Sequence, residues 1–462
     1  MSHKPDPNKN VNLTIDGKPV TVPEGTRILE AAKTVDINIP VLCEHPDLCK
    51  RALCRICVVE CDGRGKLVAA CANDVWEGVN IVTINKRLVS IRKTIIEMIL
   101  ANHPNDCLKC VRNKNCELQT LAANYGIVSS SFGNEAENNP PVIANDTIVR
   151  DTNKCVKCGR CVEACQEVQT IKAINTAFRS HEFAICTAYN QPLNDVSCVF
   201  CGYCASVCPV GSIYEHDQTS EVQAAVNNEN IKVIAQFPPS ILSALESEFS
   251  HNTAGSITQG RLIAALKLMG FDKIYNTEAA ANTVNAKIIN EIDMRKKANE
   301  HSIPLVSGCS EGVNRFINIF YPDLKDNLCG VKTPRKQFAM FKKDYAKSAG
   351  VNPQNVTSVS FVSCLAQKYT EDQDKTDFAL TVNELVRMIK RSGIIIESLA
   401  EEQFDSLSCG LPKQNFTGKK ITVSGYGQAR QIMEAVQKGE FASKYGNADW
   451  VEILSCPKGN CS

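Results

Sequence analysis

Eight cysteines fall into two copies of one spacing, C-x2-C-x2-C-x3-C, which is the most specific chemical signal in the sequence. Thiolates at this spacing ligate 4Fe–4S clusters, and in paired runs the fourth cysteine of each run ligates the cluster of the other run. The probability that eight cysteines fall into this double pattern by chance is negligible. We therefore predict two clusters, one on Cys155, Cys158, Cys161 and Cys208, and the other on Cys165, Cys198, Cys201 and Cys204.

A further group of cysteines follows a predicted β-hairpin and helix. The segment VNLTIDGKPVTV contains two β-type stretches joined by Asp16-Gly17, a strong hairpin signal, and PEGTRILEAAKTV favours a helix. Three close cysteines and a distant fourth after such elements are typical of a plant-type ferredoxin domain with a 2Fe–2S cluster. The predicted ligands are Cys43, Cys54, Cys57 and Cys71, spaced C-x10-C-x2-C-x13-C.

The next group combines one histidine with three cysteines. RLVSIRKTIIEMILANH has helical periodicity, and H-x3-C-x2-C-x5-C follows it. A lone histidine would more often be an ordinary surface residue, but directly before three ligand-spaced cysteines it reads as the fourth ligand. The predicted ligands of this 4Fe–4S cluster are His103, Cys107, Cys110 and Cys116. A neutral imidazole in place of a thiolate removes negative charge and raises the potential of the cluster.

Composition narrows the class of protein. The 462 residues include 24 cysteines, 44% hydrophobic residues and 22% charged residues, with a net charge of +1. The near-zero charge argues against a nucleic-acid partner. The sequence has no apolar stretch long enough for a membrane span and no secretory signal, so we expect a cytoplasmic protein. In that reducing compartment, clustered cysteines bind metal more often than they form disulfides. Cys49, Cys61 and Cys186 are not assigned to a cluster.

The elements around these groups predict a multidomain fold that mixes α+β and α/β parts. A β-grasp 2Fe–2S ferredoxin domain would cover residues 1–86, a histidine-ligated 4Fe–4S element 87–140, and a two-cluster bacterial ferredoxin module 141–225. SSSFGNEAENNPP reads as a connector. In residues 226–462, IKVIAQF, SVSFVSC and VEILSC favour buried strands, and LTVNELVRMIKRSG favours an amphipathic helix that ends at glycine. This last part would be an α/β domain.

The order of the cysteine groups resembles two families, the iron–iron hydrogenases and the large iron–sulfur subunit of complex I-type NADH dehydrogenases. Both begin with such a 2Fe–2S domain and an element of one histidine and three cysteines. The C-terminal half distinguishes them, because IKVIAQFPPSILSALESEF, GRLIAALKLMGFDKIYNTEAAA and IPLVSGCSEGVNRFINIFYPDLKDNLCG resemble the hydrogenase catalytic domain. EILSCPKGNC resembles its last ligand loop. The sequence is therefore identified as an iron–iron hydrogenase or a relative of one.

The resemblance implies an H-cluster, a 4Fe–4S cubane bridged to a two-iron subsite, held by four cysteines in three loops. The family's first loop, TSCCPGW, corresponds to SGCSEGV, which puts Ser310 at the ligand position and Cys309 at the proton-relay position. The second loop, MPCxxKK, corresponds to VSCLAQK. It keeps Cys364 but puts Gln367 in place of the lysine that hydrogen-bonds a cyanide of the subsite.

Further departures affect the third loop and the proton route. The family's C-x3-C before a glycine run corresponds to Cys456-x4-Cys461 near the end of the sequence. AKIINEI puts Ile288 and Glu291 where the family carries two glutamates, and Cys329 stands where it carries a serine. Isoleucine cannot carry a proton, and serine is a poor substitute for a thiolate on iron. We therefore predict a degenerate, truncated hydrogenase-like domain without an H-cluster and without catalytic residues.

Four thiols nevertheless remain in the three loops, at Cys309, Cys364, Cys456 and Cys461. A plain 4Fe–4S cubane needs only four convergent thiolates, so these loops could hold a fifth cluster. The alternative is that the cysteines persist as small buried hydrophobic residues. Cys409, in SLSCGLP, is a weaker spare ligand. For Cys456 and Cys461, iron ligation is favoured over a disulfide, given the reducing compartment.

The leading hypothesis is an iron–sulfur electron-transfer subunit of a cytoplasmic oxidoreductase complex, because a series of clusters moves single electrons but does not select a substrate. The sequence has neither a G-x-G-x-x-G fingerprint nor a P-loop. The resemblance therefore implies flavin- and NADH-binding iron–sulfur partner subunits, ferredoxin, and a separate catalytic subunit such as a nickel–iron hydrogenase or a formate dehydrogenase, as in electron-bifurcating complexes. The alternatives are a genuine iron–iron hydrogenase, or a redox or hydrogen sensor or cluster-assembly factor on a vestigial hydrogenase fold.

Overall fold

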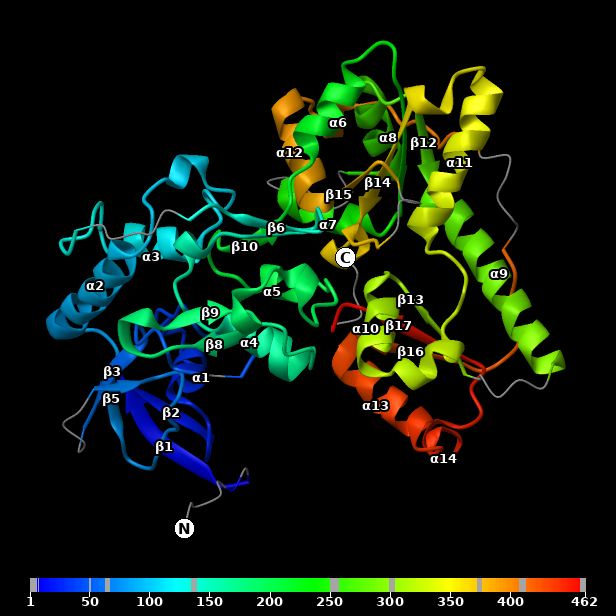
Figure 1. Cartoon of the computed structure of the whole chain (residues 1–462). Helices are drawn as coiled ribbons and strands as arrows, with labels where there is room; N and C mark the ends of the chain where they lie inside the picture. The colour runs from blue at the N-terminus through cyan, green and yellow to red at the C-terminus, as the bar shows by residue number, and fades with distance from the viewer. Residues whose placement is uncertain are drawn as a thin grey trace.

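The computed structural model (Figure 1) shows a cysteine-rich N-terminal half, coloured blue to green, beside a C-terminal half that forms two lobes. The described residues are 6, 8–49, 51–62, 67–133, 139–249, 257–298, 304–371, 376–406 and 413–457. Among the described helices, not one combines the length and the apolar character needed to cross a bilayer.

The first domain is a five-stranded sheet with one short helix. Its elements are β1 (Asn10–Ile15), β2 (Lys18–Pro23), α1 (Ile28–Lys33), β3 (Val58–Cys61), β4 (Leu67–Ala69) and β5 (Asn80–Val82). The strand order is β2-β1-β5-β3-β4, in which β1 and β5 are parallel and the other pairs are antiparallel. The predicted hairpin is confirmed: Asp16 and Gly17 both have positive φ, at 48° and 79°, as a two-residue type I′ turn requires. The predicted helix is confirmed as α1.

A two-helix element follows. It consists of α2 (Lys86–Ala101) and α3 (Glu117–Asn124), joined by a loop with a 3-10 turn at Cys107–Lys109. Asn85 caps α2 by accepting a hydrogen bond from the backbone N–H of Leu88 at 2.8 Å, which satisfies a donor that the helix leaves unpaired. The helices pack through Ile96 and Leu118. The cysteines of the histidine group therefore lie in a loop held between two packed helices. Residues 134–138 of the predicted connector lie outside the described part of the chain.

The third unit consists of short elements that frame the two cysteine runs. These are β6 (Val142–Ala144), β7 (Ile148–Arg150), α4 (Arg160–Glu163), β8 (Asn175–Ala177), β9 (Ala184–Cys186), α5 (Tyr203–Ser206) and β10 (Ile213–Glu215). The order β10-β7-β6 forms an antiparallel sheet, and β8 pairs with β9. Each run enters its helix through a glycine with positive φ, Gly159 before α4 and Gly202 before α5. This left-handed turn lets the backbone wrap around the thiols at little steric cost.

The C-terminal half contains two parallel sheets. The elements of the first lobe are α6 (Thr219–Val226), β11 (Lys232–Phe237), α7 (Ile241–Phe249), α8 (Gln259–Leu268), β12 (Lys273–Asn276), α11 (Pro334–Ala349), β14 (Val356–Val362), β15 (Phe378–Thr381) and α12 (Val382–Ser392). Its strand order is β12-β11-β14-β15. The predicted strand IKVIAQF is confirmed as β11, SVSFVSC as β14, and the predicted amphipathic helix as α12, which ends at Gly393 with φ 71°.

The second lobe has a three-stranded sheet, β13-β17-β16, that is parallel throughout. Its elements are β13 (Leu305–Gly308), α10 (Gly312–Phe320), β16 (Lys420–Ser424), α13 (Gly425–Gln437), α14 (Phe441–Tyr445) and β17 (Trp450–Leu454), and the long helix α9 (Thr277–Lys297) precedes β13. The predicted strand VEILSC is confirmed as β17. Apolar side chains of α10, α13 and β17 form the core of this lobe, with Phe316 and Tyr426 fully buried.

Strand ends determine where chemistry can occur in this half. Cys309 directly follows β13, Cys364 lies two residues after β14, and Cys456 lies two residues after β17. All three strands lie in parallel sheets, and ligands of such sheets bind beyond the carboxyl ends of the strands. The three loops named by the hydrogenase resemblance are therefore all strand-end loops.

Candidate iron–sulfur cluster sites

The four cysteines of the first domain meet at one place. The backbone N–H of Cys54 lies 3.5 Å from the Cys43 sulfur. Thiol hydrogen bonds from Cys54 and Cys71 lower the pKa of Cys43, and one from Cys71 lowers the pKa of Cys57, in both cases against the effect of burial. Sulfur atoms crowded in this way, largely out of water, fit a 2Fe–2S cluster, in which each iron takes two of four thiolates.

His103 is arranged as a ligand. Its ring is buried, and Nδ1 lies 2.9 Å from the carbonyl oxygen of Pro104, so Nδ1 carries the proton and donates it. Its Nε2 is buried with no hydrogen-bond partner among the described residues. Burial lowers the pKa of the imidazole, which keeps the ring neutral and leaves the Nε2 lone pair for iron. Cys116 lies close enough to Cys107 and Cys110 for their charges to raise the pKa of its thiol, after the larger effect of burial.

The two cysteine runs are brought together in the exchanged pattern. One cavity is lined by the first three cysteines of the first run and the last of the second, namely Cys155, Cys158, Cys161 and Cys208. A second cavity is lined by Cys165, Cys198, Cys201 and Cys204. Among the described residues, no three His, Cys, Asp or Glu side chains are grouped to hold a single metal ion. A 4Fe–4S cubane takes each thiolate on a different iron, and two cavities each lined by four thiols fit that group.

Shared apolar cores connect successive sites. One core around Ile56, Ile96 and Val210 contacts Cys54 of the first site, Cys116 of the second and Cys208 of the third. A second core contains or contacts cysteines of both cluster cavities of the two runs. A third core, which is the core of the second lobe, contacts Cys165, Cys198 and Cys201. The sites therefore follow one another through water-excluding contacts.

One ion pair, one hydrogen bond and one close packing contact hold the helical element on the module with the two runs. Arg160 donates to both carboxylate oxygens of Glu117, at 2.6 and 2.7 Å, a bidentate geometry that also fixes orientation. Arg112 donates to the carbonyl of Ala205 at 3.0 Å. Gly211 packs so closely on Cys110 that a Cβ there would lie 2.7 Å from the sulfur. The second and third sites are thus held at a fixed separation.

In the C-terminal half, two of the four predicted thiols share one cavity. Cys364 and Cys456 line a cavity of about 360 Å³ together with Cys201 of the neighbouring site. Gly202 lies against the second loop, where its Cβ would come within 2.6 Å of Leu365. Cys461 and Cys409 lie outside the described residues, so the spacing expected for the third loop is not tested.

Cys309, in the first loop, is hydrogen-bonded to the third loop. Its sulfur accepts a hydrogen bond from the backbone N–H of Ser455, the residue before Cys456, at 3.3 Å. The neighbouring Ser310 is buried, and its hydroxyl lies 2.8 Å from the hydroxyl of Ser455, which in turn lies 3.0 Å from the hydroxyl of Tyr426. The Ser310 side chain is therefore engaged in a chain of hydroxyl groups.

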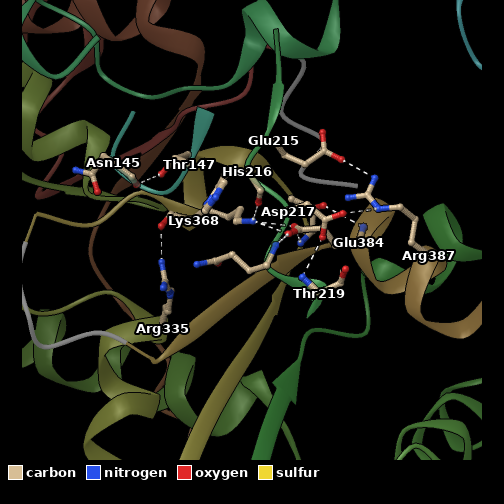
Figure 2. Close-up of polar contacts among 12 residues, drawn as sticks. Asn145, Thr147, Glu215, His216, Asp217, Thr219, Arg335, Lys368, Glu384 and Arg387 are labelled. Atoms are coloured by element: carbon tan, nitrogen blue, oxygen red, sulfur yellow. Dashed lines mark hydrogen bonds and ion pairs between the residues drawn. The ribbon is translucent and has the colours of Figure 1, made fainter. Parts of the chain in front are cut away.

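The second loop is anchored by a buried ion pair, shown in Figure 2. The Lys368 ammonium donates to both carboxylate oxygens of Glu384 at 2.8 Å and to the carbonyl of His216 at 2.6 Å. The two side chains are 1% and 0% exposed. Glu384 also accepts from the backbone N–H of Gln218 at 2.9 Å. Since 216–218 directly follow β10, this pair joins the second loop to the unit that carries the cysteine runs.

A second cavity in this half, of about 390 Å³, is lined by Cys309 and lies between the two parallel sheets. Helix α9 contributes Ile288 to its wall, and the second loop contributes Gln367. The Gln367 amide oxygen accepts from the backbone N–H and the hydroxyl of Ser363, at 3.2 and 3.3 Å. The side chain at this position is therefore neutral and is held by its own loop.

An aliphatic side chain, that of Ile288, lies between the other residues named for a proton route and the cavity. The Cys329 thiol lies 3.4 Å from a carboxylate oxygen of Glu291, and that carboxylate pairs with Arg295 at 2.6 Å. Ile288, one turn before Glu291 on α9, is buried and packs with Cys329. Cys329 and Glu291 are therefore in contact with each other, but the Ile288 side chain, which has no proton to exchange, lies between them and the cavity.

Models of four protein families match the chain. They are the 2Fe-2S iron-sulfur cluster binding domain over residues 8–86, the NADH-ubiquinone oxidoreductase-G iron-sulfur binding region over 92–131, the ferredoxin-like domain of NADH-quinone oxidoreductase subunit 3 over 145–214, and the C-terminal domain of the iron only hydrogenase large subunit over 231–418. The matches follow one another along the chain in the order that the cysteine groups predict.

The NADP-reducing hydrogenase subunit HndD of Solidesulfovibrio fructosivorans is 34% identical over 415 residues, which are 86% of this chain and 71% of that relative. The chain belongs to the iron-only hydrogenase large-subunit family. Iron hydrogenase 1 of Clostridium pasteurianum is 28% identical over 405 residues, 85% of this chain and 70% of the relative. A solved NAD+-reducing NiFe hydrogenase in the H2-reduced state is 28% identical over 44% of this chain and 87% of that chain, with a TM-score of 0.42.

Although the chain belongs to the iron-only hydrogenase family, its residues at the positions that correspond to the H-cluster site do not fit that cluster. Ser310, at the position of a ligand, shares a hydrogen bond of 2.8 Å between its hydroxyl and that of Ser455. Gln367, at the position of the lysine that contacts cyanide, brings no charge to the cavity and is bonded within its own loop. The four N-terminal donor sets, in contrast, lie within the residues matched by the 2Fe-2S cluster binding domain, the NADH-ubiquinone oxidoreductase-G iron-sulfur binding region and the ferredoxin-like domain.

Some residues of this hydrogenase-like site could not be found from the sequence. Gln169, Tyr426 and Ser455 meet at the boundary of two cluster sites, and none belongs to a ligand pattern. The adjacency of Ser455 to Cys456 was the only signal for any of them. The Lys368–Glu384 pair was likewise unexpected, because the two residues are 16 positions apart in different elements.

Proposed function

We propose that this chain is an iron–sulfur electron-transfer subunit of a cytoplasmic multi-subunit oxidoreductase, of the NADH- or ferredoxin-linked, electron-bifurcating hydrogenase type. It relays electrons between a flavin- and NADH-binding module and a catalytic partner and has no H-cluster of its own. The single observation that carries this proposal is the succession of four donor sets joined by shared cores, ending at Cys201 beside Cys364 and Cys456.

The ligand assignments belong to the proposal. Support comes from convergence of the first four thiols, from the buried lone pair on His103, and from the two cavities lined by exchanged cysteines. For a fifth 4Fe–4S cluster, support comes from Cys364 and Cys456 on one cavity and from the bond between Cys309 and Ser455. Cys461 would complete the set. The Ser310 hydroxyl is engaged elsewhere and is not among the proposed ligands.

The partners follow from what the family members are named for. The relative from Solidesulfovibrio is named as one subunit of an NADP-reducing hydrogenase, and two matching domains are named for NADH oxidoreductases. We infer a partner subunit with a flavin that takes a hydride from a nicotinamide, and a separate catalytic subunit such as a nickel–iron hydrogenase or formate dehydrogenase. Electrons would also pass to or from ferredoxin.

The test is to tag this chain in its native host, isolate the complex anaerobically, and identify its other subunits. We expect a flavin-containing NADH-binding subunit to copurify, and NADH to reduce the clusters of this chain only in its presence. The chain alone should carry about 14 irons, or about 18 with the fifth cubane. A purified chain that turns over hydrogen alone, or shows infrared bands of bound CO and cyanide, would overturn the proposal in favour of a genuine hydrogenase.

A further inference from the structure

Gln169 is a fully buried glutamine at the end of the helical segment that carries Cys165. A buried side-chain amide has two donor hydrogens and one acceptor oxygen to satisfy. Here Nε2 donates to the carbonyl of Ser455 at 2.8 Å, and Oε1 accepts from the backbone N–H of Tyr426 at 2.9 Å. Burial raises the pKa of the Cys201 thiol, and a hydrogen bond from the Gln169 side chain acts in the opposite direction. The three partners of this amide thus lie in three separate segments.

Two of these partners, Cys201 and Ser455, lie at two different cluster sites. Cys201 lines the cavity formed by the second cysteine run with Cys165. Ser455 precedes Cys456, and its own backbone N–H donates to the Cys309 sulfur at 3.3 Å. The Gln169 side chain and the backbone of Ser455 therefore connect the Cys201 thiol of one site with the Cys309 thiol of the next.

The contact around this connection is tight. A Cβ on Gly427 would lie 2.7 Å from the carbonyl oxygen of Val168, and a Cβ on Gly425 would lie 2.9 Å from the backbone of Pro457. Arg430 donates to the side-chain and main-chain oxygens of Thr170, each at 3.0 Å. The start of α13 is thus pressed against residues 168–170, and this packing holds Gln169 in one position.

We propose that Gln169 is a positioning residue for electron transfer, which links the site of Cys165, Cys198, Cys201 and Cys204 to the strand-end loops that carry Cys309 and Cys456. This rests on the proposed function. A continuous hydrogen-bonded connection carries electronic coupling better than a gap of the same length. An N–H donated to a ligand sulfur also stabilises the more negative, reduced state and raises the potential. The transfer moves one electron, and Gln169 keeps both of its amide protons.

The test compares Gln169→Met and Gln169→Glu with the native chain, all in the isolated complex. Methionine keeps the volume but removes donors and acceptor, whereas glutamate keeps the acceptor for Tyr426 and loses both donors. We expect both variants to lower the midpoint potential of the cluster on Cys165, Cys198, Cys201 and Cys204 in a redox titration followed by electron paramagnetic resonance. Rapid freeze-quench after mixing with reduced ferredoxin should show reduction of the C-terminal cluster slowed at least tenfold.

Gln337→Met is the matched control. Gln337 is also buried, and its amide oxygen accepts from the Lys287 ammonium at 2.8 Å. It lies on α11 and lines neither the cavity of Cys165, Cys198, Cys201 and Cys204 nor the cavity of Cys364 and Cys456. This control should leave the potential and the transfer rate unchanged. Iron content and thermal unfolding of all variants separate a positioning effect from loss of the cluster or of the fold.

Two results would overturn the inference. If both Gln169 variants keep the native potential and the native rate, Gln169 has a packing role only. If the native chain carries about 14 irons and no C-terminal signal, the link has no second site, although electron transfer through the four N-terminal clusters would stand. Loss of that electron transfer in the native complex would instead contradict the proposed function itself.

Discussion

The N-terminal half, residues 8–215, and the C-terminal half, residues 231–457, both place cysteines at the ends of regular elements, but the surroundings of the thiols differ. In the first half the proposed ligands face shared spaces, because two cavities are each lined by four cysteines and Nε2 of His103 is buried with no hydrogen-bond partner among the described residues. In the second half neighbouring hydroxyls and amides satisfy one another, as in the chain from Ser310 to Tyr426. Electron relay needs ligands and spacing, whereas hydrogen chemistry also needs a proton route into the cavity, and the aliphatic side chain of Ile288 stands on that route.

The largest expected effect comes from breaking the exchange of fourth ligands. Cys208→Ser should lose about four irons and the same resonance signal that Cys158→Ser loses. Cys165→Ser should lose the signal that Cys201→Ser loses. The reason is that Cys208 lines the cavity of the first run and Cys165 that of the second. Iron analysis with electron paramagnetic resonance measures both. The opposite pairing of lost signals would show that each run keeps its own fourth cysteine.

Breaking the junction between the halves should cost less. Lys368→Met leaves the Glu384 carboxylate buried without its cation, so the free energy of unfolding of the C-terminal half should fall by about 3–5 kcal/mol. Denaturant unfolding followed by fluorescence measures this. Lys342→Met is the matched control, because its pair with Asp377 is partly exposed and should contribute no more than about 1 kcal/mol. Equal losses in the two variants would mean that burial of the Lys368 pair is not what matters.

The next effect concerns one ligand in the N-terminal half. His103→Cys replaces a neutral ligand with an anionic one, so the potential of that cluster should fall by an amount on the order of 100 mV while the iron content stays unchanged. A redox titration measures the shift. His181→Ala, at an exposed position, should leave every potential unchanged. An unaltered potential in His103→Cys would remove the histidine from the ligand set.

The smallest expected effect comes from restoring two family residues, which should not produce any hydrogen turnover. Restoring the family's residues with Ser310→Cys and Gln367→Lys should not produce hydrogen turnover, because Ile288 still separates Glu291 from the cavity. Hydrogen evolution from a chemically reduced donor, measured after coexpression with hydrogenase maturation proteins, tests this. Adding Ile288→Glu to the pair provides the comparison. Turnover by the double variant without that third change would show that the proton route is not limiting.

The sequence predicts features that are local and misses those that depend on distant contacts. The ligand runs, the hairpin at Asp16 and the glycine stop of α12 each depend on a few neighbouring residues, and a pattern captures them. Gln169 and Ser455 are 286 positions apart, and only the packing of α13 against residues 168–170 brings them together. The family resemblance indicated that Ser310 cannot replace a thiolate, but it could not show that Ser455 and Tyr426 occupy its hydroxyl.

The order of strands in the second lobe has a consequence for biosynthesis. β17, the last described strand along the chain, lies in the middle of the sheet β13-β17-β16. During translation β13 and β16 therefore cannot pair with the central strand of their sheet until β17 has left the ribosome, and the loops of Cys309 and Cys456 cannot meet before then. The N-terminal domains can fold first, as domains generally do during synthesis. Iron could then enter the N-terminal sites on a nascent chain, whereas a cluster on the loops of Cys309 and Cys456 would have to wait until β17 has emerged.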